Sequence, residues 1–288
     1  MAYTKSTGTA AGETIDTSNG PLKAVSPPSR RLLFSEVRAL PELYGFLAAL
    51  PTLAATAPRG DGQPVLVLPG LATTDNSTWA LRRFLAFLGY PTYGWEQGRN
   101  YGPLPGVEEK LKASVRRLAD EHGRKVSIVG WSLGGIYARQ LGKALPDEIR
   151  QVISMGSPFN GDPRATNAWK LYQFTSGHDV DTKDRHMGGE ISPPPPVPTT
   201  SIYSRTDGIC AWQTCLETPA TNRENIEVRG SHCGLGHNAA AVYAVADRLA
   251  LPEGGWTPFQ RTGLKKLAFP RPRADDVMGV VPGVAAAA

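Results

Sequence analysis

The chain has 288 residues, of which 41% are hydrophobic and 20% charged, as is usual for a globular protein. Its 31 basic and 26 acidic residues leave a net charge of +5. There is no dense basic stripe with interleaved aromatic side chains, which argues against nucleic-acid binding. There is also no run of the roughly 20 consecutive apolar residues that span a bilayer.

Residues 1–30 are rich in Ser, Thr, Gly and Pro and lack the apolar segment of a secretory signal. We therefore expect a disordered tail and a cytoplasmic protein. Residues 31–57 have apolar side chains at helical spacing, but Pro41 and Pro51 interrupt the pattern and predict two short helices. The segment is apolar and partly basic. We expect it to pack on the core, and peripheral membrane contact is the alternative.

Short apolar runs alternate with helical patterns along the rest of the chain. The runs predict strands at 65–68, 91–95, 126–129, 152–155, 201–203 and 226–228. The helical patterns lie at 77–88, 107–121, 133–145 and 238–249. This alternation predicts an α/β protein with a mostly parallel central sheet and helices on both faces.

The alternation stops at residues 159–198, which end in a proline-rich tract. We interpret this stretch as a small cap inserted over the sheet, because long interruptions in compact domains are usually functional or disordered. The sequence thus predicts one domain over 31–270, which includes the cap. Residues 271–288 form a second tail that we expect to lack fixed structure.

The pentapeptide Gly130-Trp131-Ser132-Leu133-Gly134 lies between a predicted strand and a predicted helix. Gly-x-Ser-x-Gly is common by chance, but a nucleophile elbow requires this strand–turn–helix context. The glycines fit it, because a serine on a tight, strained turn needs neighbours without side chains. The alternative is a glycine-rich turn without chemistry, as in nucleotide-binding folds, whose glycine spacing differs. We predict that Ser132 is a nucleophile.

Residues from about 64 to 250 resemble the α/β-hydrolase superfamily, on its lipase and esterase side. Residues 65–70 resemble the first central strand and oxyanion loop of bacterial lipases, and 130–134 resemble their elbow. Residues 155–161, Met-Gly-Ser-Pro-Phe-Asn-Gly, resemble a segment often written Gly-Thr-Pro-His-x-Gly. The resemblance implies the α/β-hydrolase fold and serine-hydrolase chemistry.

In that fold the catalytic residues follow the order Ser, Asp or Glu, His. Asp207 follows a predicted strand and precedes a glycine, where the family places its acid, although an Asp-Gly turn is the alternative. His232 and His237 compete for the base. His232 begins His-Cys-Gly-Leu, which matches the His-x-Gly-Leu of related lipases, whereas His237 stands at a helix start. The resemblance therefore implies a triad of Ser132, Asp207 and His232.

An oxyanion hole needs two backbone N–H donors. Leu133 is the first, and Leu71 is the best match for the second, with Ala72 next. The family often has His-Gly in this loop, where this chain has Pro-Gly, so the identity of the second donor stays open. The triad needs no cofactor or metal, and we expect neither.

The three cysteines, Cys210, Cys215 and Cys233, have the wrong spacing for a zinc site. We expect small apolar thiols, and a disulfide among them stays open.

The leading functional hypothesis is hydrolysis of a small-molecule or lipid carboxylic ester through an acyl-enzyme. Acyl transfer by the same triad and a non-catalytic binding protein on the same fold are the alternatives. Chain-length preference and oligomeric state are not determined by these patterns. The candidates for an apolar acyl pocket are Leu71, Trp79, Trp95, Trp131, Phe159, Trp169 and Phe174.

Overall fold

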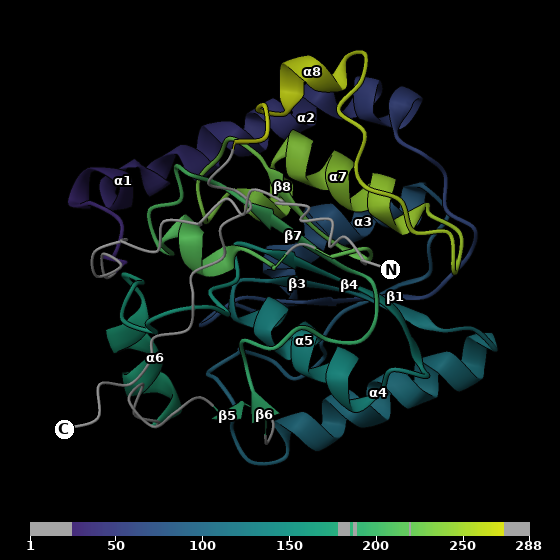
Figure 1. Cartoon of the computed structure of the whole chain (residues 1–288), viewed down its shortest axis with the longest axis horizontal. Helices are drawn as coiled ribbons and strands as arrows, with labels where there is room; N and C mark the ends of the chain where they lie inside the picture. Colours follow the sequence, from purple (N-terminus) through teal and green to yellow (C-terminus); the bar gives the residue numbers. More distant parts are fainter. Residues whose placement is uncertain (1–24, 178–184, 187–188, 219, 274–288) are drawn as a thin grey trace, which may run out of the picture.

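The computed structural model describes residues 25–177, 185–186, 189–218 and 220–273. A six-stranded sheet with the order β2-β1-β3-β4-β7-β8 runs through its centre (Figure 1), and all neighbouring strands are parallel. These strands are β1 (Val65–Leu68), β2 (Thr92–Tyr93), β3 (Val126–Trp131), β4 (Ile149–Met155), β7 (Thr199–Tyr203) and β8 (Arg223–Glu227). Each overlaps a strand expected from the sequence, so the prediction of a parallel α/β sheet is confirmed.

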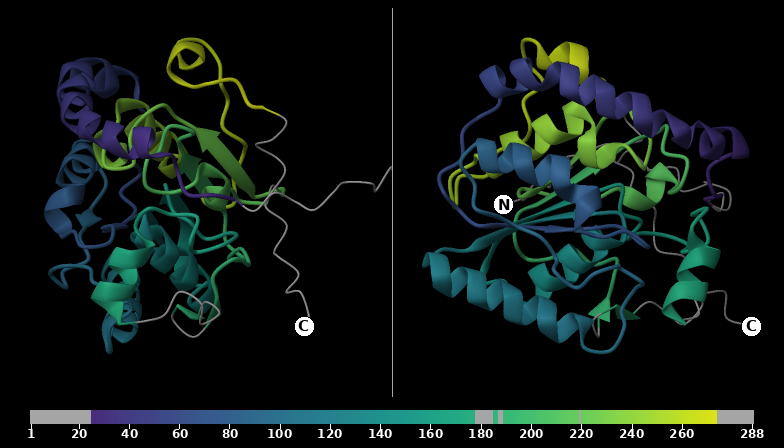
Figure 2. Two further views of the ribbon diagram at one scale, coloured as in Figure 1. Left: turned by 90° about the vertical axis from the view of Figure 1, so that its left-hand side faces the viewer. Right: turned by 180° about the vertical axis from the view of Figure 1, so that it is seen from behind.

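Helices cover both faces of the sheet (Figures 1 and 2). One side carries α2 (Ala39–Thr56), α3 (Trp79–Phe87) and α7 (Ala239–Leu249), and the other carries α4 (Val107–His122) and α5 (Leu133–Ala144). The shorter elements are α1 (Arg30–Phe34), α6 (Trp169–Ser176), α8 (Lys265–Ala268), η1 (Ser35–Arg38), η2 (Asp75–Thr78), η3 (Trp212–Cys215), η4 (Leu235–His237), β5 (Arg185–His186) and β6 (Gly189–Glu190).

The core has two halves, one on each face of the sheet. In β1, Val65 and Val67 belong to the apolar cluster that includes α2, α3 and α7, whereas Leu66 and Leu68 belong to the cluster with α4 and α5. Successive residues of a strand point to opposite faces, and here both faces are covered. This explains why the strands appear in the sequence as unbroken apolar runs.

The N-terminal helical segment breaks at a different place from the one predicted. It changes from α1 to α2 through the 3-10 turn η1, and neither proline ends a helix. Pro41 stands in the first turn of α2, where backbone N–H groups have no acceptor within the helix. Pro51 lies inside α2 and removes one hydrogen bond of the helix. The helix continues through it because Phe46 and Leu53, on either side in the sequence, are buried against the core.

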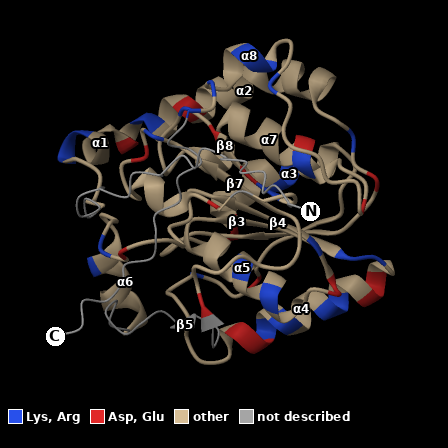
Figure 3. Cartoon of the chain, in the orientation of Figure 1, with Lys and Arg blue, Asp and Glu red and all other residues tan. Residues whose placement is uncertain are grey.

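This segment packs on the core by one face only. Its opposite face exposes Phe34, Val37, Leu40, Tyr44 and Leu47. None of the helices in the described ranges is long and apolar enough to cross a membrane. In α4 the acidic residues stand near the two ends of the helix and the basic residues lie between them (Figure 3).

The predicted cap contains α6 and the short antiparallel pair β5–β6. In both orientations α6 and α1 lie toward the same end of the molecule (Figures 1 and 2). Residues 178–184 and 187–188 of the predicted cap are outside the described residues, as are 1–24 and 274–288, which make up most of the predicted tails. The extent of the cap therefore stays a prediction.

Candidate functional site

The predicted site residues lie in loops at the carboxyl ends of the strands. Residues 69–71 follow β1, Ser132 follows β3, Asp207 comes after β7 and His232 after β8. The carboxyl ends of parallel strands share one edge of a sheet, and ligands bind in the crevice outside that edge. The parallel topology therefore brings these four loops, which are far apart in the sequence, to the same edge of the sheet.

Ser132 occupies the tight turn between β3 and α5. Its φ of 54° and ψ of −122° are strained for a residue with a side chain. The Ser132 N–H donates to Met155 O at 2.8 Å, which ties the turn to β4. A Cβ on Gly130 would collide with the backbone of Gly134, and one on Gly134 would collide with Leu68 O. Backbone crowding is thus the physical reason for both glycines of the pentapeptide.

Asp207 and His232 form a buried pair. The His232 Nδ1–H donates to Asp207 Oδ2 at 2.6 Å, and the two residues are 5% and 3% exposed. Asp207 Oδ1 accepts the backbone N–H groups of Ile209 at 2.8 Å and Cys210 at 2.7 Å. Both carboxylate oxygens are therefore held, and the carboxylate in turn orients the imidazole.

Burial by itself lowers the pKa of His232. The charge and hydrogen bond of Asp207, with the charge of Glu36, outweigh burial and raise this pKa above its ordinary value of 6.5. The surroundings therefore favour a positively charged imidazole.

Trp131 connects the histidine loop with the elbow. Its indole N–H donates to His232 O at 3.1 Å, and the two rings lie 6.2 Å apart between centroids. Ser132, the next residue, is half-buried, and its hydroxyl has no hydrogen-bond partner within the described residues. Such bonds often form only with substrate in place. The structure thus joins Asp207 to His232 and sets this pair beside the turn that carries Ser132.

His237, the competing base, has another partner. Its Nε2 lies 2.8 Å from Ala39 O at the start of α2. The ring therefore ties η4 to α2, whereas Asp207 pairs with His232.

The two expected oxyanion donors stand in the loop after β1 and at the start of α5. Leu133 is the first residue of α5, so its N–H has no acceptor within the helix. The Ala72 N–H donates to Asn100 O at 2.7 Å and is occupied, which favours Leu71 as the second donor. The loop reaches the elbow, because a Cβ on Gly70 would lie 3.2 Å from Ser132 Cβ.

Asn100, which the sequence analysis did not single out, organises this loop. It is fully buried, and its Nδ2 donates to Pro69 O at 2.9 Å. Its backbone N–H donates to Thr73 O at 2.8 Å, and the Thr73 hydroxyl donates to Gly70 O at 2.8 Å. An asparagine among glycines in a loop carries no sequence signal that separates this role from an ordinary turn.

Three charged residues of the N-terminal segment were also missed. Glu36, Arg38 and Glu42 all hydrogen-bond to the loops that carry Asp207 and His232. The helical prediction for this segment rested on its apolar positions. Charged residues between such positions ordinarily face solvent, so the pattern gave no reason to single these three out.

Three nearby groups could in principle hold a metal ion. Ligand atoms of Asp207, Cys210 and His232 lie within 4.8 Å of one another. However, the oxygens of Asp207 are bound to N–H groups. The hydrogen bond that the Cys210 thiol makes with Cys215, together with burial, also raises the pKa of Cys210, which disfavours the thiolate that binds metals. These residues do not fit a metal site. Cys210, Cys215 and Cys233 are free thiols.

The aromatic candidates for an acyl pocket divide into buried and exposed groups. Trp95 stacks on Tyr137 in the core, and the Arg139 guanidinium covers the ring of buried Phe159 at 3.7 Å. Trp131 is buried as well, whereas Trp79 and Phe174 are exposed. Trp169 and Leu71 are half-buried. The buried members serve as packing.

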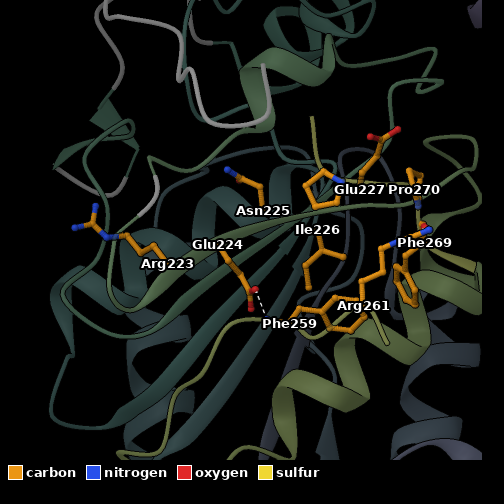
Figure 4. Close-up of a pocket in the computed structure, with 10 residues that line it drawn as sticks. Arg223, Glu224, Asn225, Ile226, Glu227, Phe259, Arg261, Phe269 and Pro270 are labelled. Carbon is orange, nitrogen blue, oxygen red and sulfur yellow. Dashed lines mark hydrogen bonds between the residues drawn. The ribbon is translucent and has the colours of Figure 1, made fainter. Parts of the chain in front are cut away.

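A cavity of about 200 Å³ lies elsewhere, at the edge strand β8 (Figure 4). The C-terminal segment closes it with Phe259, Arg261 and Phe269, and Glu224 accepts the Phe259 N–H at 2.7 Å. None of Ser132, Asp207 and His232 lines this cavity, so it is separate from the candidate site.

The structure is similar to that of lipase B from Aspergillus fumigatus, with a TM-score of 0.55 and 18% identity over 78% of this chain and 62% of that one. It is also similar to a monoacylglycerol lipase from Paleococcus ferrophilus, with a TM-score of 0.45 and 14% identity over 65% of this chain and 96% of that one. No family model and no curated protein sequence matches this chain.

The likeness to lipase B concerns the fold. With its parallel sheet, the chain has the α/β-hydrolase fold that the sequence resemblance predicted. The matched region covers about 62% of the length of that lipase.

Proposed function

We propose that this protein is a serine hydrolase that cleaves carboxylic esters. The observation that carries the proposal is the buried Asp207–His232 pair, joined at 2.6 Å, beside the strained turn of Ser132. Burial, a fixed carboxylate and a half-buried serine on a helix N-terminus together suit nucleophilic catalysis.

In the proposed mechanism Ser132 Oγ attacks the ester carbonyl carbon while His232 Nε2 accepts its proton. Asp207 keeps the other ring proton on Nδ1 and stabilises the imidazolium. The backbone N–H groups of Leu133 and Leu71 stabilise the oxyanion. His232 then protonates the leaving alcohol, and an acyl-enzyme remains. A water molecule that gives a proton to His232 attacks the acyl carbon, and the acid leaves as Ser132 recovers its hydroxyl proton.

Hydrolysis is the form of this chemistry that we favour over acyl transfer, because the half-buried Ser132 is accessible to water. A binding protein on the same fold would have no need for the strained elbow. The proposed substrates are small-molecule or lipid esters. Cytoplasmic localisation and peripheral membrane contact stay predictions, and co-sedimentation with lipid vesicles tests the second.

A p-nitrophenyl ester series of increasing acyl length, from acetate to palmitate, tests the proposal. We expect hydrolysis by the wild type and labelling by a fluorophosphonate probe, with both lost in Ser132→Ala. His232→Ala and His237→Ala form a matched pair, and we expect a loss of roughly 10³-fold or more only in the first. A wild type that neither hydrolyses any ester nor reacts with the probe would overturn the proposal.

A further inference from the structure

Glu36, in η1, contacts both loops of the candidate acid–base pair. Its Oε1 accepts the N–H of Gly208 at 2.7 Å and the N–H of His232 at 3.0 Å, and its Oε2 accepts the N–H of Cys233 at 2.8 Å. Gly208 directly follows Asp207. One carboxylate therefore bridges the residue after the acid and the base itself.

Both oxygens of the Glu36 carboxylate accept hydrogen bonds from these backbone groups. The residue is 9% exposed, and within the described ranges no Lys or Arg forms an ion pair with it. Hydrogen bonds to a charged acceptor are about twice as strong as neutral ones, and the buried N–H groups would otherwise lack partners. A glutamate with only a surface role would lie in solvent, whereas the Glu36 carboxylate is buried against the two loops.

The local sequence makes room for this contact. A Cβ on Gly208 would collide with Leu32 O and would lie 2.9 Å from Glu36 Oε1. The glycine after Asp207 thus allows the N-terminal segment to approach closely. Close packing, in addition to the turn, therefore explains why a glycine follows Asp207.

Two further charged residues of the same segment also contact these loops. The Arg38 guanidinium donates to Thr206 O in the acid loop and to Gly230 O, at 3.0 Å, in the base loop. Glu42 accepts the N–H of Ser231 at 2.8 Å and its hydroxyl at 2.7 Å.

We propose that Glu36 is a positioning residue, which ties the acid loop to the base loop and holds the Asp207–His232 pair in register with Ser132. The inference rests on the proposed function. The N-terminal segment is on this view a part of the catalytic unit, although it precedes the parallel sheet in the chain.

The test compares Glu36→Gln with Glu36→Asp and with Glu109→Gln, a control at an exposed carboxylate on α4. A glutamine offers one acceptor oxygen and no charge. We expect kcat to fall roughly 10–100-fold in Glu36→Gln, as for supporting residues of other sites, with KM changed less than about threefold. Glu36→Asp, which keeps the charge on a shorter side chain, should recover part of the loss.

The pH profile supplies a second readout. Among the residues that the structure describes, the titratable groups around the imidazole are Asp207, Cys210 and Cys233 from the two loops and Glu36 from η1. Loss of the Glu36 charge lowers the pKa of His232, so the acid limb of kcat/KM moves to lower pH in Glu36→Gln. The limb of Glu109→Gln stays in place.

The outcomes separate the two proposals. If the wild type reacts with esters and folded Glu36→Gln keeps both its kcat and its acid limb, the positioning role is wrong and the hydrolase proposal stands. If the wild type itself is inert, the hydrolase proposal fails first. If Glu36→Gln does not fold, Glu36→Asp carries the test: its shorter carboxylate cannot reach both loops equally, and an unchanged kcat there contradicts the inference.

Discussion

A single glycine at the end of β4 permits the acid–base pair to form. Gly156 has a φ of 57°, in the left-handed region that favours glycine. A Cβ there would lie 3.1 Å from His232 Nδ1 and 3.3 Å from Asp207 Oδ2. The position is thus constrained twice, by backbone conformation and by the space that the imidazole and carboxylate need.

Gly156→Ala should therefore impair activity as well as stability. The matched control is Gly98→Ala, because Gly98 also has a positive φ, of 73°, but open space around it. Both variants should lose about 1 kcal/mol or more of unfolding free energy from the left-handed backbone. Only Gly156→Ala should also lose kcat, which steady-state kinetics on a p-nitrophenyl ester measures. Equal kcat in the two variants would count against the proposed site.

The raised pKa of His232 sets the pH dependence of the proposed reaction. The base accepts a proton only when it is neutral, so kcat/KM should fall as the pH drops through this pKa. Because the pKa lies above 6.5, the acid limb should lie above pH 6.5. The same shift contributes stability that is fully present below pH 6.5 and is lost as the pH rises through the folded-state pKa. An acid limb at or below 6.5 in the pH–rate profile contradicts this assignment.

At the scale of elements, loops after the strands are held by buried and half-buried polar groups from other parts of the chain. Asn100 fixes the loop after β1, and the segment from η1 into α2 fixes the loops after β7 and β8. Buried polar groups with complete hydrogen bonding specify one loop conformation, which apolar packing alone does not. The parallel strands thus bring the proposed nucleophile and the proposed base to one edge of the sheet, and these contacts set the relative positions of their loops.

Asn100→Ala tests the loop after β1. It leaves Pro69 O without its donor at 2.9 Å, which should cost about 1–3 kcal/mol of unfolding free energy. Movement of Leu71 should also lower kcat more than it raises KM, because an oxyanion donor acts mainly in the transition state. Denaturant unfolding and ester kinetics measure the two effects. A variant with lower stability and unchanged kcat would mean that Asn100 serves folding only.

Across the whole molecule, a buried ion pair connects α5, the helix after Ser132, to the segment after η3. Arg139 of α5 and Glu217 form this pair with side chains 0% and 1% exposed. Arg139 also donates to Ser192 O at 3.0 Å and to Pro193 O at 3.3 Å, in the segment that leads back to the sheet. This one side chain therefore joins the elbow helix to the return from the predicted cap.

Glu217→Gln should destabilise the fold by about 3–5 kcal/mol, because it leaves the Arg139 charge buried without its partner. The exposed pair Arg117–Glu121 on α4 provides the control, and Glu121→Gln should cost less than about 1 kcal/mol. Urea unfolding of the two variants measures the difference. Similar values for both would show that the buried pair does not hold these segments together.

Local sequence by itself indicated the main strands and helices and the candidate nucleophile. Apolar runs marked the strands, and Gly123 marked the end of α4, because these features depend on neighbours in the chain. The pentapeptide at Ser132 could be recognised for the same reason. The resemblance added Asp207 and His232, and their contact agrees with the pairing it implied.

Only the tertiary structure decided which distant groups support these residues. Glu36 lies almost two hundred residues before His232, and its partners are backbone N–H groups, which leave no trace in the side-chain pattern. The same holds for Asn100 and for the contact between His237 and Ala39 O, since each depends on which segments the fold brings together. Pro51 was misjudged because packing outweighed its local effect. The spacing of apolar residues indicates which face of a helix or strand is buried. Hydrogen bonds between loops depend instead on which segments the folded chain brings together.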